Sequence, residues 1–494
     1  MKKLTSVILL ALVSSSFLIA GGLITNTNQS AAWARTLSRN ATLGVDAVYF
    51  NPAGLGTFKN GLHLSLSNQS IFQTRSISSD YMYLSDAPKT YEAELVAPLF
   101  PSIYAAYKLD KWAFSAGFNI IGGGGSADYE TGLPSFEIPV GSLVPMLQGS
   151  LLPIDQGVEG AIGVNPGFAN ISGYNMDASF SGASTYYGIQ VGATYAINDM
   201  ISVAIGGRYV MVNNSYEGSL EGVTIDAPEV YGGTQTPGNY LRTVATTPYV
   251  SGDPVTVATL NGTATLLDAA TADAALNTVQ KGSGFAPIVG INIHLTDMIN
   301  IAAKYEHRTK IELTNDTEAT NIDLYPDGET VRADLPGMFT LGASVSPIKK
   351  LTASVGFDYF LDIPAYYGKV DEDGEPINNE TTIDQNAYTI HASLEYKLLG
   401  ILGLSAGFST GNLGVNDDYQ SDLNHALKSS SIAGGVFVDV GELLTVNAGF
   451  VHVMYDDYTK AQSYTPMGFP QAVPFSDTYS KATNLFAIGV DIRL

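Results

Sequence analysis

From Gly61 to the last residue, the chain repeats one pattern: short segments in which apolar residues alternate with small or polar ones. Side chains in a β-strand point alternately to opposite faces, so a period of two predicts strands with one apolar face. A strand in a barrel wall faces lipid and lumen in the same alternation. The final segment shows the pattern most clearly, with one parity apolar (Phe486, Ile488, Val490, Ile492, Leu494) and the other small or charged (Ala487, Gly489, Asp491, Arg493).

The spacing of these segments predicts how they connect. Most are joined in pairs by tight turns such as Asp110-Lys111, Asn198-Asp199 and Gly441-Glu442, whose residues are common turn formers. Every second connection is long, roughly 73–99, 122–183, 213–285, 315–335, 363–385, 412–428 and 457–482. Short periplasmic turns and long extracellular loops produce that rhythm, whereas a soluble β-sandwich has no reason to lengthen alternate connections. We therefore predict an all-β fold, a transmembrane antiparallel β-barrel of about 14 strands.

Polar residues on the other parity support a closed barrel. In lipid each charged side chain would cost several kcal/mol, so these residues are expected to line the interior. They include Gln190, Arg208, Asn292, His294, Lys304, Glu306, Asp358, His391, Glu395 and Asn447.

The N-terminus has the features of a secretory signal. Lys2 and Lys3 precede a largely apolar run over residues 4–19, and Ala20 begins a group of small residues suited to cleavage. A membrane anchor is the alternative, but the run is short and interrupted by serines. We expect a signal peptide over 1–20, an N-terminal segment over 21–57 and a barrel over 58–494. The localisation that follows is the outer membrane of a Gram-negative bacterium, with insertion by the barrel assembly machinery that reads the C-terminal strand.

The composition limits the partners. The formal net charge is −23, from 24 Lys and Arg against 47 Asp and Glu, which argues against nucleic acid. Acidic loops suit either simple solubility or divalent cations that bridge lipopolysaccharide beside the outer-membrane lipid. With no cysteine, disulfides and lipoprotein acylation are excluded.

The segment before the first strand suggests a family. It contains small residues around Trp33 and Arg35, continues through residues 40–50 and closes with Asn51-Pro52-Ala53. A weakly helical leader closed by Asn-Pro-Ala just before strand one resembles the FadL family, which includes TodX-like aromatic hydrocarbon channels. The resemblance implies a fourteen-stranded barrel with the N-terminal segment folded in the lumen as a hatch. It also implies inward passage of long-chain fatty acids or other apolar molecules, captured by apolar extracellular loops and released sideways through a kink in the third strand.

Three groups of residues fit these roles. Asn51 can cap a helical turn that Pro52 begins, with Ala53 packed in the lumen; a plain turn into the first strand is the alternative. The run Gly122, Gly123, Gly124 and Gly125 follows the third strand and is either the lateral kink or a flexible start of a loop. An apolar stretch in the next loop, comprising Leu143, Val144, Met146, Leu147, Leu151 and Leu152, is a candidate ligand-capture groove or packs against an alanine-rich, helical stretch near 263–280.

No catalytic set is evident. His294 and His391 are isolated on lumen-facing positions, and the acidic stretch 371–375 lacks the spacing of a calcium loop, so it is expected to be a solvated loop. We therefore expect neither an enzyme nor a cofactor or metal. The predicted function is passive uptake of long-chain fatty acids or other hydrophobic molecules. A diffusion porin for small polar solutes and a barrel enzyme acting on lipids are the alternatives.

Overall fold

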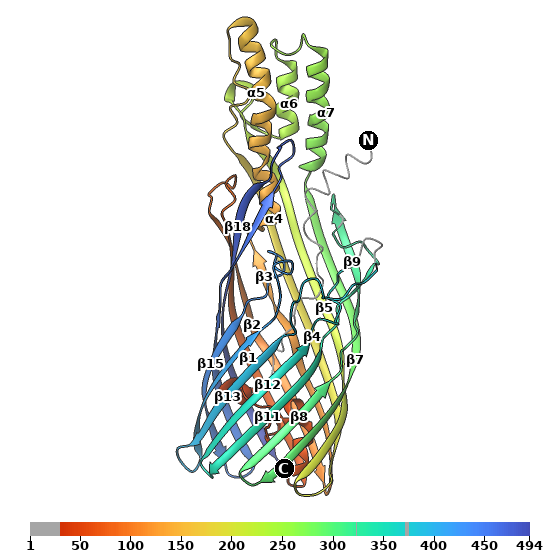
Figure 1. Ribbon diagram of the computed structural model, residues 1–494, viewed down its shortest axis with the longest axis vertical. Coiled ribbons are helices and arrows are strands. Elements are labelled where there is room, and N and C mark those ends of the chain that lie inside the picture. Colours follow the sequence, from red (N-terminus) through yellow and green to blue (C-terminus); the bar gives the residue numbers. More distant parts are fainter. Residues whose placement is uncertain (1–29, 323, 371–374) are drawn as a thin grey trace.

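A computed structural model describes residues 30–322, 324–370 and 375–494. The expected signal peptide, the first part of the N-terminal segment and residues 371–374 of the acidic stretch lie outside the described residues. The described chain forms one long antiparallel barrel crowned by helices at one end (Figure 1).

The barrel closes because the first strand pairs with the last. β1 (Gly61–Ser79) pairs with β2 (Lys89–Leu109) on one side and with β18 (Val473–Arg493) on the other. Within the described part of the chain, fourteen strands make the complete circuit, and each pairs antiparallel with its neighbours. This confirms the predicted barrel of about 14 strands. The other eleven wall strands are β3 (Trp112–Tyr129), β4 (Tyr174–Ala196), β5 (Ile201–Asp226), β7 (Ala274–Thr296), β8 (Ile299–Glu306), β11 (Gly337–Ile348), β12 (Leu351–Leu361), β13 (Tyr388–Lys397), β14 (Leu402–Asn412), β15 (Ser429–Val440) and β16 (Leu444–Tyr455).

Four short strands extend the wall at the end that carries the long connections. They are β6 (Thr234–Gln235), β9 (Glu312–Thr320), β10 (Thr330–Arg332) and β17 (Tyr458–Tyr464).

The alternation in the sequence sets which way each side chain faces. On β18, Ile488 is 63% exposed on the outer surface, whereas its neighbour Ala487 is 7% exposed and faces inward. The same parity holds on β4, where Val191 points outward and Gln190 is buried inside. The outer surface is therefore an apolar band suited to lipid, and the polar parity lines the lumen as predicted.

Several strands are far longer than a membrane requires. A membrane-spanning strand needs about 9–11 residues, but β5 has 26 and β4 and β7 have 23 each. The predicted loop bounds 73–99, 122–183, 213–285 and 457–482 are therefore wrong, because strand structure continues well into each range. Beyond the lipid both faces of a strand meet polar surroundings, so the apolar alternation fades although the backbone hydrogen bonding continues.

Helices stand above the barrel on these long strands. α4 (Pro134–Gly141) and α5 (Leu143–Ile162) lie between β3 and β4. The short helix η2 (Glu229–Tyr231) and the helices α6 (Pro237–Thr246) and α7 (Pro254–Ala270) lie between β5 and β7. We call α5, α6 and α7 the helical cap (Figure 1).

The predicted bounds of the helix at 263–280 are wrong, because α7 ends at Ala270 and β7 begins at Ala274. Among the residues that the structure describes, none of the helices combines the length and apolar character needed to cross a membrane.

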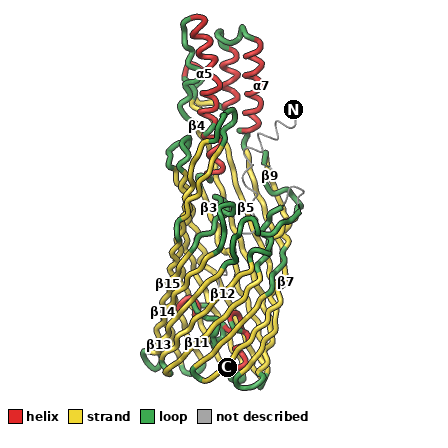
Figure 2. The backbone as a smooth tube through the Cα atoms, viewed as in Figure 1, coloured by secondary structure: helices red, strands yellow, loops and turns green. Residues whose placement is uncertain are grey.

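The N-terminal segment folds inside the barrel. Residues 30–57, which we call the hatch, form α2 (Ala31–Thr36), α3 (Ala47–Phe50) and the 3₁₀ helix η1 (Pro52–Thr57). Figure 2 shows these helices within the lower part of the barrel, near the short turns. The predicted hatch in the lumen is thereby confirmed.

Candidate functional site

The hatch turn at Asn51 is built as its sequence suggests. The Asn51 side-chain oxygen accepts the backbone N–H of Gly54 at 3.2 Å, and Pro52 begins η1. The predicted role of Asn51 as the N-cap residue of this helical turn is therefore confirmed. The Asn51 amide also donates to the side-chain oxygen of Asn292 on β7 at 2.8 Å. One side chain therefore both shapes the turn and ties it to the wall.

Polar wall side chains satisfy the carbonyl groups of the hatch. The Lys304 ammonium donates to the carbonyl of Tyr49 at 2.9 Å, and the Ser202 hydroxyl donates to the carbonyl of Ala53, which is fully buried, at 2.6 Å. A buried backbone carbonyl without a partner is costly, so these contacts hold a short, irregular segment in place. Similar bonds run from Gln190 to Val48, from Thr194 to Pro52 and from Asn300 to Ala41.

Buried charges also join the hatch to the wall. Arg35 on α2 forms an ion pair with Glu395 on β13 and donates to the side-chain oxygen of Asn447 on β16 at 3.0 Å. Arg39 forms two bonds to Asp46 within the hatch, at 2.6 and 2.8 Å. Because the Arg35 side chain is only 7% exposed, losing its partner would leave a charge with little access to water.

A polar vestibule lies between the hatch and the short turns of the barrel. Its volume is about 900 Å³, and charges of both signs line it, among them Arg35, Arg39, Glu395, Asp439 and Asp491. An apolar molecule gains nothing by entering such a space. The lumen on the short-turn side of the hatch is therefore lined largely by polar and charged groups.

The wall itself is interrupted between β2 and β3. The two strands are paired from the short turn up to Ser102 and Asn119. Pairing resumes only at Glu94 and Asp128. The glycine run lies in β3 at this interruption, and the β3–β4 register shifts on both sides of Gly123. Gly123 has φ of +68°, and a Cβ there would meet the Ser184 carbonyl of β4 at 1.7 Å, so only glycine fits.

β2 contributes to the same interruption. Pro98 and Pro101 lie within β2 at this level and carry no N–H to donate to a neighbouring strand. On the β1 side, Asn68 and Ser70 bond to the Pro98 carbonyl at 3.1 and 2.9 Å and so replace part of the ladder. Leu95 of β2 reaches across and packs where a Cβ of Gly125 would lie.

An apolar cluster lies inside the barrel beside this interruption. We call it the inner apolar cluster; it joins hatch residues of α2 to the wall, with Trp33 packed against it. Because Phe100 and Ile120 come from β2 and β3 at the interrupted ladder, the cluster reaches the interruption itself. Its buried members are Ala31, Ala34, Leu37, Ile71, Ala97, Phe100, Ile120, Val451, Leu485 and Ala487.

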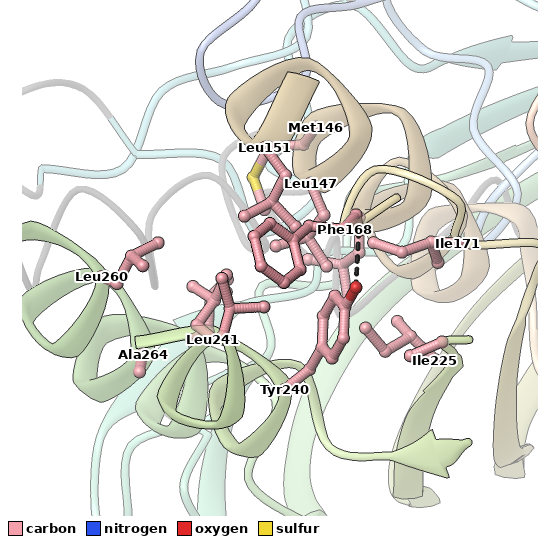
Figure 3. Close-up of a cluster of buried hydrophobic side chains, with 14 of the residues drawn as sticks. Met146, Leu147, Leu151, Phe168, Ile171, Ile225, Tyr240, Leu241, Leu260 and Ala264 are labelled. Carbon is pink, nitrogen blue, oxygen red and sulfur yellow. Dashed lines mark hydrogen bonds between the residues drawn. The ribbon is translucent and has the colours of Figure 1, made fainter. Parts of the chain in front are cut away.

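The apolar loop predicted to capture ligand forms α5 and packs into the core of the cap. Figure 3 shows Met146, Leu147 and Leu151 against Leu241 and Leu260, and the hydroxyl of Tyr240 bonds to the Phe168 carbonyl. Leu143 is also buried and Val144 is partly buried in this core, whereas Leu152 is 48% exposed. Packing on neighbouring helices, one of the two interpretations left open by the sequence, therefore describes five of the six residues. Capture of a ligand here stays a prediction.

The connection between β14 and β15 lies at the end of the barrel that carries the long connections. We call residues 413–428 the mouth loop; it buries Asp422, His425 and Leu427. The Asp422 carboxylate accepts the backbone N–H of Ser135 at the start of α4 at 2.8 Å. Burial raises the pKa of Asp422 above its ordinary value.

Comparison with known proteins identifies the fold. No protein-family profile and no curated protein matches the chain. Solved structures match nearly all of it: a Pseudomonas aeruginosa FadL homologue has a TM-score of 0.61 at 11% identity, covering 96% of this chain and 99% of the homologue. The P. putida toluene transporter TodX has a TM-score of 0.53 at 15% identity, covering 96% and 99%. The Ralstonia pickettii toluene transporter TbuX has a TM-score of 0.50 at 14% identity, covering 97% and 100%.

The chain has the FadL/TodX fold.

On this FadL/TodX fold, the residues singled out from sequence occupy three separate places. Asn51, Pro52 and Ala53 lie at the hatch, the glycine run at the wall interruption and the apolar loop in the cap. The contribution of β2 to the wall interruption was not predicted from the sequence. Two prolines three residues apart in a strand were a usable signal, because proline is rare where both edges of a strand must be paired.

Proposed function

We propose that this protein carries hydrophobic molecules, long-chain fatty acids or other apolar compounds, passively through the outer membrane of a Gram-negative bacterium. One observation carries the proposal: a hatch is folded within the lumen and bonded to the wall, while the wall is interrupted between β2 and β3 beside the inner apolar cluster. A molecule that leaves through that interruption enters lipid, which only a hydrophobic compound favours.

The same observation weighs against a diffusion porin. Polar solutes need a continuous water-filled passage, and the hatch occupies the lumen with buried residues bonded to the wall. For an apolar molecule, removing surface from water contributes roughly 25 cal/mol per Å², so transfer towards lipid is favourable without an energy source.

In this scheme the parts of the site have distinct roles. The cap, including Leu152 and the helix that holds Leu147, receives the ligand at the extracellular side, and Asn51, Pro52 and Ala53 hold the hatch against the wall. The glycine run and Leu95 form the lateral exit. Two structural neighbours are described as toluene transporters, which supports an apolar substrate. Assembly by the barrel machinery and contact with lipopolysaccharide belong to the same proposal.

A disulfide across the interruption tests the exit. The chain has no cysteine, so Leu95→Cys with Gly125→Cys introduces a single pair at the point where Leu95 covers Gly125. The matched control is Ala105→Cys with Ala116→Cys, which joins directly opposed residues where the β2–β3 ladder is intact.

We expect the oxidised gap pair to abolish uptake of oleate and toluene by expressing cells, and reduction to restore it. The control pair should leave uptake unchanged in both states. Full uptake with the gap disulfide formed, verified by mass spectrometry, would refute a lateral exit.

A further inference from the structure

One polar side chain is buried in the wall beside the interruption without a hydrogen-bond partner. Gln69 of β1 is fully buried, and neither its amide nitrogen nor its amide oxygen forms a hydrogen bond. Among the buried side-chain amides of the residues that the structure describes, Gln69 alone has both ends unpaired. A buried amide without a partner destabilises a fold, so its presence here needs a reason.

Other buried amides of the lumen are satisfied within the protein. Gln190 donates to the Val48 carbonyl at 2.6 Å and accepts from the Arg208 guanidinium at 2.8 Å. The amide nitrogen of Gln280 likewise donates to the side-chain oxygen of Asn315 at 2.8 Å. The unpaired amide on β1 is therefore an exception to the way this lumen treats its polar groups.

The immediate surroundings of Gln69 are apolar. On β1 it is directly opposed to Phe100 of β2 on one side and to Ala487 of β18 on the other. Side chains at opposed positions of neighbouring strands lie in contact. Both residues belong to the inner apolar cluster, whose buried members all carry apolar side chains. The Gln69 amide is thus a polar group set into the wall of an apolar cluster.

Gln69 also lies where the hatch and the wall interruption meet. The two steps from Gln69 to Ile71 on β1 face three steps on β2, so β2 bulges next to the amide. Two residues earlier on β1, the Ser67 hydroxyl accepts the backbone N–H of Ala31 at the start of α2 at 3.1 Å. A molecule that moves from the inner apolar cluster to the interruption therefore passes this amide.

The chemistry of the amide defines what can satisfy it. Its nitrogen donates and its oxygen accepts, and a hydroxyl matches both because it donates and accepts at one oxygen. A hydrocarbon would leave both ends of the amide unpaired. A carboxylate would bring a charge into a cluster whose members carry none, and burying a charge without a counter-charge is costly.

We propose that Gln69 is a specificity-determining residue, whose amide binds the hydroxyl of an uncharged hydrophobic alcohol or phenol on its way to the wall interruption. This rests on the proposed function and names a substrate class for it. The cluster is closed on Gln69 in the structure, so the ligand reaches the amide as it parts Phe100 from its neighbours. The ligand O–H then donates to the amide oxygen and accepts an amide N–H.

Calorimetry on the purified full-length protein tests this assignment with toluene and para-cresol, which is toluene with one added hydroxyl. We expect the wild type to bind para-cresol more tightly, although toluene is the more hydrophobic of the two. Gln69→Met keeps the length of the side chain and removes both hydrogen-bonding groups. It should reduce the ratio of the two affinities at least fivefold, and partition into the detergent cancels when both proteins are compared in the same detergent.

Gln73→Met is the matched control. Gln73 lies four residues further along the same face of β1, and its amide donates to the Thr483 hydroxyl and accepts from Arg75, both at 2.7 Å. Because this amide is already satisfied, its replacement should leave the ratio of the two affinities unchanged.

An unchanged ratio in Gln69→Met, including equal weakening for both ligands, would overturn the assignment. If Gln69→Met fails to form a heat-modifiable barrel, the wild-type ranking decides, and tighter binding of toluene overturns the assignment as well. Uptake of toluene by expressing cells in either case leaves the proposed function standing. A wild type that binds neither compound and supports no uptake overturns the proposed function and the role of Gln69 together.

Discussion

Replacing Glu395 of the barrel wall by Gln should weaken the docking of the hatch, although no hatch residue is changed. Glu395 projects from β13 into the lumen, where it pairs with Arg35, and the Arg39 guanidinium lies 3.7 Å away. The Arg35 side chain is 7% exposed and that of Glu395 18%. Glutamine keeps the size of the side chain and removes its charge, so the change acts on the charge interactions of Glu395 with Arg35 and Arg39.

The magnitude follows from burial. Breaking a buried ion pair by removing one partner destabilises by roughly 3–5 kcal/mol, because the other charge stays desolvated. Arg35 retains its bond to Asn447, so we take the lower end, about 3 kcal/mol. The penalty applies only while the hatch is docked, because Arg35 regains water when the hatch leaves. The equilibrium between docked and undocked hatch should therefore shift by about a hundredfold.

Conductance in planar bilayers measures this shift directly, since an undocked hatch admits ions. Glu395→Gln should open more often than the wild type, and protease should cleave the hatch faster. The matched control is Glu442→Gln, whose partner Lys59 is 87% exposed, and it should behave as wild type because an exposed pair contributes little. A folded Glu395→Gln barrel with wild-type conductance and wild-type protease resistance would refute the argument that these charges hold the hatch.

Three further predictions follow from the fold. The closed ladder leaves no free edge in the membrane, so the protein should migrate differently on SDS gels before and after boiling, and identical mobility would count against the barrel. Val355→Arg, on the lipid face of β12, should destabilise the assembled barrel by roughly 2–4 kcal/mol. The adjacent Ser354→Arg, which points into the polar vestibule, should assemble normally. Equal yields of folded barrel for the two variants would show that the wall register is wrong. Leu147→Ser should destabilise the cap by about 2–5 kcal/mol, because Leu147 is buried. Leu152→Ser, at an exposed position, should leave the cap resistant to limited proteolysis and weaken uptake. Unchanged uptake for Leu152→Ser would argue against ligand capture at that surface.

The wall of the barrel could be predicted from sequence because lipid imposes a local rule. Each residue of a membrane-spanning strand meets either lipid or lumen, so the parity of Ile488 and Ala487, or of Val191 and Gln190, is written in the order of the residues. The cap of η1 by Asn51 was equally local, because donor and acceptor are three residues apart. These features need no knowledge of the closed fold.

Features that depend on which strands meet were decided only by the tertiary structure. The donors that hold the hatch come from more than a hundred residues away, as with Gln190 and Val48, and closure of the sheet brings them together. Closure also sets Arg75 of the first strand against Lys481 of the last. The burial of Leu147 arose in the same way, because α5 packs on helices from another connection, and no lipid boundary imposes a pattern there. The local alternation of residues reports whether each face of a strand meets lipid or lumen. Tertiary structure decides which segments become neighbours, and those neighbours make the hatch contacts, the wall interruption and the core of the cap.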